Sequence, residues 1–82
     1  MEQKFTNAME LMSEIEEDLT VPKNIKLKIK EIKNYFEDES SLIEVKANKA
    51  MEILDNISDD TNIPSHTRAQ IWSIMSVLES NE

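Results

Sequence analysis

Apolar residues recur every three or four positions in four separate stretches of the chain, which is the spacing of one face of an α-helix. The pattern therefore predicts four amphipathic helices, each with one face turned toward a common core. The residues predicted to face inward are Phe5, Ala8, Met9, Met12, Ile15 and Leu19, then Ile25, Ile29, Ile32 and Phe36, then Ile43, Ala47, Ala50, Met51, Leu54 and Ile57, and finally Thr67, Ile71, Ile74, Met75 and Leu78.

Two prolines and one acidic stretch mark where the helices begin and end. Proline is tolerated in the first turn of a helix, where its missing N–H would have no partner, so Pro22 and Pro64 predict the starts of the second and fourth helices. Residues 37–41 are acidic and polar and predict the central connection. Ser41 followed by Glu44 is a capping-box pattern at the start of the third helix. We expect a hairpin over about 2–36 and another over about 42–80.

The two halves of the chain resemble each other at an offset of 42 residues. Shifting residues 5–36 onto 47–78 aligns 8 identical residues in 32 positions, and the prolines and the acidic turns coincide. Each half therefore reads as a helix, a short turn and a second helix. The prediction is an all-α protein of one domain, residues 1–82, that forms an antiparallel four-helix bundle from two similar αα-hairpins.

Composition and charge exclude several classes of chemistry. The chain has 82 residues, 9 Lys+Arg against 17 Asp+Glu, a net charge of −8, and neither Gly nor Cys. Without these two residue types it can form no glycine-rich phosphate loop, disulfide or thiolate site. No apolar run approaches the roughly 20 residues of a membrane span, so we expect a cytoplasmic protein without a membrane partner. A domain this small has marginal stability unless it packs well or oligomerises, so self-association is one expectation.

Two segments resemble a known family. The stretch from Glu17 to Ile25, and above all the stretch from Ile53 to Arg68 followed by Ile71 and Trp72, are similar to the archaeal uncharacterised protein family 0147. The resemblance covers almost the whole chain. It implies a short helical bundle, and it brings no established activity, cofactor or site residue with it.

His66 is the single histidine and the first candidate for catalysis or metal binding. With Asp59 and Asp60 it could form a carboxylate–imidazole metal site. The alternative is that Asp60 and Asn62 accept hydrogen bonds in the turn while His66 lies half-exposed at the start of the fourth helix. The sequence favours the alternative, because no nucleophile or further ligand accompanies the histidine. We therefore predict a protein that is not an enzyme, with no catalytic, cofactor-binding or metal residue.

A basic stripe stands out in this acidic chain. Residues 22–36 carry a net charge of +4 (five Lys against one Glu), and four lysines fall on one flank of the second helix. These residues, the lysine stripe, are Lys23, Lys26, Lys30 and Lys33. The stripe could contact a phosphate backbone or an acidic partner, or it could be a solvated flank that offsets neighbouring acidic helices. The net charge of −8 favours the solvated flank.

The equivalent flank of the fourth helix differs in chemistry. An offset of 42 aligns Arg68, Trp72 and Met75 with Lys26, Lys30 and Lys33 in the sequence. Arg, Trp and Met are enriched in protein interfaces. Arg68 could stack on the Trp72 indole, although Trp72 could equally close the edge of the bundle. We therefore predict a non-enzymatic protein that binds a protein partner or itself, with a dimer favoured. The alternative is a nucleic-acid-associated accessory protein.

Overall fold

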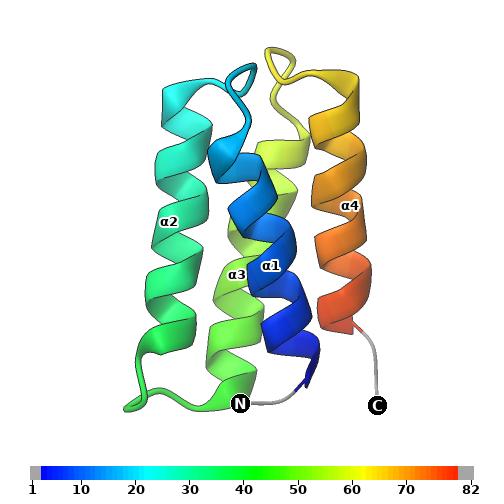
Figure 1. Cartoon of the computed structure of the whole chain (residues 1–82). Coiled ribbons are helices and arrows are strands. Elements are labelled where there is room, and N and C mark those ends of the chain that lie inside the picture. The colour runs from blue at the N-terminus through cyan, green and yellow to red at the C-terminus, as the bar shows by residue number, and fades with distance from the viewer. Residues whose placement is uncertain (1–2, 80–82) are drawn as a thin grey trace.

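The computed structural model describes residues 3–79, which form four helices and no strand. The helices are α1 (Gln3–Glu17), α2 (Lys23–Glu37), α3 (Ile43–Ser58) and α4 (Ser65–Glu79). They run alternately up and down, with α1 packed on α2 and α4, and α3 packed on the same two helices (Figure 1). The all-α four-helix fold predicted from the spacing of apolar residues is confirmed. Across residues 3–79, no helix has both the length and the apolar character needed to cross a membrane.

The core is a single column of aliphatic and aromatic side chains between the four helices. All four inward positions predicted for α2 are buried, and most of those predicted for the other helices are buried or half-buried. Two predictions were wrong: Leu19 is 95% exposed and Ile43 is 48% exposed. The buried hydrophobic residues are Phe5, Ala8, Met12, Ile15, Val21, Ile25, Ile29, Ile32, Phe36, Ala50, Leu54, Ile57, Ile63, Ile71, Ile74 and Leu78.

Burial follows the 42-residue offset that was found in the sequence. Every buried residue from Ala8 to Phe36 has a buried equivalent 42 positions later, from Ala50 to Leu78. The exception is Phe5, which is buried in α1 and corresponds to the smaller, half-buried Ala47 of α3. The two hairpins therefore contribute equivalent positions to one core and differ in volume at one end of it.

The three connections share one turn that requires no glycine. In each turn an aspartate carboxylate accepts the backbone N–H of the residue two positions later, with N···O distances of 2.8 Å for Asp18, 3.0 Å for Asp38 and 2.8 Å for Asp60. The N–H of each aspartate donates to the carbonyl three residues before it. Residues 3–79 contain no backbone with positive φ. The aspartate side chain thus reverses the chain at negative φ, as an Asx turn does.

The start of α3 differs from the prediction. Leu42 occupies the N-cap position, and no side chain caps this helix. The predicted capping box is therefore wrong. The Ser41 hydroxyl belongs to the aspartate turn, where it donates to Asp38 Oδ2 at 3.1 Å instead of capping α3. The central connection runs over 38–42 rather than 37–41, since Glu37 still belongs to α2. The expected hairpin limits at residues 2 and 80 lie outside the described residues.

Thr67 is the one buried polar residue in this core, and its hydroxyl oxygen has no hydrogen-bond partner among the described residues. It occupies the position that Ile25 fills in the first hairpin. Burying an unpaired hydroxyl costs about 1–3 kcal/mol. We therefore expect Thr67→Val to raise the free energy of unfolding by about 1 kcal/mol and the melting temperature by roughly 4–8 °C. Thermal and urea denaturation would measure both, and Thr67→Ser, which keeps the hydroxyl, should show no such gain.

Candidate functional site

The two ends of the bundle are closed in different ways. At the end formed by the α1–α2 and α3–α4 turns, Val21 and Ile63 follow the aspartate turns and cover the core, each only 5% exposed. At the opposite end, where the α2–α3 connection meets the start of α1, the equivalent turn position is Ser41 (Figure 1). A half-buried serine cannot supply the apolar cover that valine and isoleucine give. We call this second end the open end.

A groove of about 540 Å³ lies at the open end. Phe5 and Phe36 form its aromatic side, with ring centroids 4.9 Å apart and ring planes inclined at 67°, the edge-to-face packing that aromatic rings favour. The Lys4 ammonium lies 5.8 Å from the Phe5 centroid. The groove is lined by Phe5, Phe36, Glu37, Glu39, Ser41, Ile43 and Lys46.

Three large aliphatic side chains at the start of α3 are exposed, and one of them, Ile43, lines the groove. Leu42 is 73% exposed, Ile43 48% and Val45 46%. They form the first turn of α3 together with the residue before it, and no residue of α3 is buried until Ala50. The first turn of α3 therefore extends beyond the packed part of the core, which the helix reaches at the half-buried Ala47.

Charged groups surround the open end unequally. Glu37, Glu39 and Glu44 are exposed. Lys46 donates from Nζ to the Phe36 carbonyl oxygen at 3.2 Å, so its charge lies against the carbonyl end of α2, where a cation is favourable. Hydrogen bonds from the Ser40 hydroxyl and backbone lower the pKa of Asp38, with Ser41 adding to the effect, so this carboxylate also stays ionised.

The surface predicted from Arg68, Trp72 and Met75 is only partly available. Arg68 donates from Nε to the Ser58 carbonyl at 3.1 Å and from Nη2 to the Asp60 carbonyl at 2.7 Å. It thereby caps the C-terminal end of α3 instead of stacking on Trp72. Met75 is half-buried against the core, whereas Trp72 is 56% exposed.

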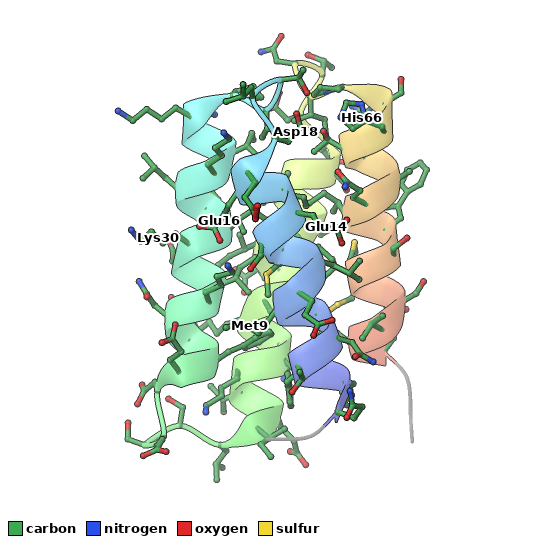
Figure 2. The ribbon with its side chains drawn as sticks, viewed as in Figure 1. Met9, Glu14, Glu16, Asp18, Lys30 and His66 are labelled. Atoms are coloured by element: carbon green, nitrogen blue, oxygen red, sulfur yellow. The ribbon has the colours of Figure 1, made fainter. Side chains whose placement is uncertain are left out.

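The lysine stripe is also divided. Lys33 Nζ forms an ion pair with Glu16 and donates to Ser13 Oγ at 2.7 Å, so this lysine joins α2 to α1. Lys23 and Lys30 are exposed, and Lys30 points away from the bundle (Figure 2). Lys26 is half-buried. The structure therefore leaves fewer free ammonium groups on this flank than the helical wheel predicted.

His66 meets a different carboxylate from the two that the sequence suggested. Its Nε2 lies 2.7 Å from Asp18 Oδ2, so the start of α4 is joined to the first turn of the chain (Figure 2). Asp60 instead accepts the N–H of Asn62 in its own turn. Among residues 3–79, no group of three carboxylate, histidine or cysteine side chains is arranged to hold a metal ion.

The His66 cluster does not have the geometry of a nucleophile and its base. Thr20 Oγ1 lies 3.5 Å from the same Nε2 that faces Asp18, and the Thr20 hydroxyl itself donates to Asp18 Oδ1 at 2.6 Å. A relay needs the nucleophile on one ring nitrogen and the carboxylate on the other. The cluster is therefore a cross-link between the two hairpins. Hydrogen bonds from the Thr20 hydroxyl and backbone, followed by His66, lower the pKa of Asp18 to about 2.

Sequence reasoning missed both the open end and the Asp18–His66 pair. The open end had a signal: the second aspartate turn continues Ser41-Leu42 where the other two continue Val21-Pro22 and Ile63-Pro64. The Asp18–His66 pair had none, because the two residues are 48 positions apart and meet only after the helices pack.

Arg68→Met should destabilise the protein by about 1–3 kcal/mol, because two carbonyls at the end of α3 lose a charged donor. Arg68→Lys should recover only part of the loss, since lysine cannot reach both oxygens with one planar group. Urea denaturation measures the difference. Trp72→Ala serves as the comparison, and an equal loss of stability in that variant would contradict the assignment of Arg68 to the cap.

Acid should weaken the Asp18 turn in a defined interval. The folded protein holds the pKa of Asp18 near 2 while its ordinary value is 3.8, so the resulting stabilisation is complete above about pH 4 and is lost as the pH falls toward 2. NMR titration should show a larger rise of this pKa in Thr20→Val than in His66→Ala, because the threonine contributes the larger share. The reverse order would contradict this assignment.

Comparison with known proteins gives one family. The model of the uncharacterised protein family UPF0147 matches residues 1–80. No curated protein matches the chain.

Two crystal structures resemble this one along nearly their whole length. The first is a Methanococcus protein of unknown function, MMP1188, which is 42% identical with a TM-score of 0.88 over 96% of this chain and 90% of that one. The second, from Thermoplasma acidophilum, belongs to the uncharacterised family UPF0147 and is 30% identical, with a TM-score of 0.88 over 93% and 89% of the two chains. The chain therefore belongs to the uncharacterised protein family UPF0147.

Proposed function

We propose that this protein is a non-enzymatic protein-binding module whose contact surface is the open end of the bundle. The observation that carries the proposal is the groove at the open end, where Ile43 of the lining is 48% exposed and the adjoining Leu42 is 73% exposed. An exposed apolar surface bordered by polar residues is typical of interaction sites on small proteins. Burying a side chain of this size contributes about 1.5–3 kcal/mol, so covering several of them would supply binding energy.

The other end of the molecule shows that this exposure is not required by the fold. The same aspartate turn, followed by Val21 or Ile63 and then proline, closes the core where it occurs. Ser41 and Leu42 replace that pair in the middle turn, where Phe5 and Phe36 close the core instead and Leu42 is left 73% exposed. A local difference that costs apolar burial favours a role for the exposed surface over a role in folding.

The remaining candidate sites support this choice. Arg68 and Met75 are engaged within the bundle, so the fourth-helix flank retains Trp72 as its one large exposed apolar group among the three predicted residues. The His66 cluster links the hairpins and has no relay geometry. A chain without cysteine gains nothing from an oxidising compartment, and we place the proposed role in the cytoplasm.

A nucleic-acid role is the weaker alternative. Lys23 and Lys30 are exposed and could contact phosphates, whereas Lys33 is held by Glu16 and Ser13. Phosphate contacts would make binding fall steeply with salt and with lysine-to-glutamate changes. Nuclease treatment during partner capture separates this alternative from direct protein binding.

The experiment compares partner capture from source-cell lysate by the unchanged protein and three tagged variants, each with and without nuclease. Ile43→Glu places a charge in the groove. Trp72→Ala removes the exposed indole, and Leu27→Glu is the matched control, since Leu27 is 59% exposed on α2. We expect Ile43→Glu alone to reduce recovery of a specific partner about tenfold or more, with unchanged helicity by circular dichroism.

Other outcomes locate the contact elsewhere. Loss of the partner in Trp72→Ala would assign it to the fourth helix. A partner equally retained by all variants, or recovered only without nuclease, would contradict the proposal. Sedimentation equilibrium on the same variants tests self-association: a dimer that Ile43→Glu dissociates would make the partner a second copy.

A further inference from the structure

The open end combines a hydrophobic groove with an acidic surround. Its apolar side consists of Phe5, Phe36 and Ile43, and the exposed carboxylates of Glu37 and Glu39 form another part of the lining. A segment that enters the groove must therefore satisfy two requirements at once. It needs a bulky apolar side chain to pack on the apolar side of the groove and positive charge to pair with the carboxylates.

Counting the charges around the groove gives a net negative sign. Four carboxylates, from Glu37, Asp38, Glu39 and Glu44, lie in the connection and the adjoining helix turns, against the ammonium groups of Lys4 and Lys46. The Lys46 ammonium is directed at the Phe36 carbonyl and the Lys4 ammonium lies near the Phe5 ring. Both cations thus lie close to groups of the bundle itself, while Glu37 and Glu39 remain exposed in the lining of the groove.

The acidic edge argues against a second copy as the occupant. A symmetric end-to-end dimer would place Glu37 and Glu39 of both copies close together, and each copy carries a net charge of −8. Like charges facing one another across an interface cost several kcal/mol. Nucleic acid is disfavoured by the same repulsion.

We propose that the occupant is a cationic segment of another protein, which packs a bulky apolar side chain into the groove against Ile43 while its lysines or arginines meet Glu37 and Glu39. This inference rests on the proposed protein-binding function and specifies its partner chemistry. Leu42 is 73% exposed between Ser41 and Ile43 of the lining, so it can extend the apolar contact beyond the groove, which suits a peptide segment rather than a small molecule.

The test uses three synthetic peptides that differ only in chemistry. One has a central pair of leucines flanked by lysines, one has the same leucines flanked by glutamates, and one has serines in place of the leucines with the lysines kept. Each is titrated into the isotopically labelled full chain, and backbone amide shifts are followed by NMR. We expect the first peptide to shift amides of residues 36–46. Each of the other two should bind with an affinity at least about tenfold lower.

Two charge-reversal variants of the chain separate local from global electrostatics. Glu37→Lys with Glu39→Lys changes the edge of the groove, and Glu10→Lys with Glu14→Lys changes the net charge equally on exposed positions of α1. The first pair should weaken binding of the lysine–leucine peptide about tenfold, and the second less than about threefold. Equal effects would show attraction to the whole acidic protein and would overturn the proposal.

Three further results would also overturn it. These are equal affinity for the glutamate peptide, undiminished affinity for the serine peptide, and no shift at residues 36–46 with any peptide. If the chain alone shifts these same amides as its concentration rises, the occupant is a second copy. The capture experiment with Ile43→Glu does not depend on any of these results. Failure of the proposed partner chemistry can therefore be distinguished from failure of the proposed protein-binding function.

Discussion

The fold depends on one local interaction, the hydrogen bond from an aspartate carboxylate to the backbone N–H two residues later, made by Asp18, Asp38 and Asp60. Helices commonly end on a glycine in the left-handed region, and this chain has no glycine. The aspartate side chain ends each of the first three helices and reverses the chain with negative φ throughout residues 3–79. The residue three positions after it then decides whether the turn itself adds an apolar side chain to the core.

The four helices could be predicted because their apolar spacing records one geometric fact, a buried face with a period of 3.6 residues. The prediction failed where the helix ends and the spacing no longer applies. Leu19 lies four positions after Ile15 but beyond the end of α1, within the aspartate turn, and is therefore exposed. Ile43 has the right spacing inside α3, but no helix packs closely enough around its first turn to bury it.

The candidate sites were less predictable because their chemistry depends on partners from other helices. A helical wheel places Lys33 on a free flank, yet Glu16 and Ser13 of α1 engage it. Arg68 was expected to be able to stack on the Trp72 indole, and the Ser58 and Asp60 carbonyls hold it instead. Both are long side chains that reach the nearest acceptor, and the identity of that acceptor is fixed only by the tertiary packing.

The bundle places the Asp18–His66 pair and the Arg68 cap at one end, and the groove with the exposed Ile43 at the other. Val21, Ile63, the Arg68 cap and the Asp18–His66 pair all stabilise the end formed by the first and third turns. A small domain has a free energy of unfolding of only about 5–15 kcal/mol, so exposure of Leu42 and Ile43 is tolerable because Phe5 and Phe36 close the core at that end. The two ends therefore differ in the apolar side chains that they leave exposed, and not in whether the core is closed.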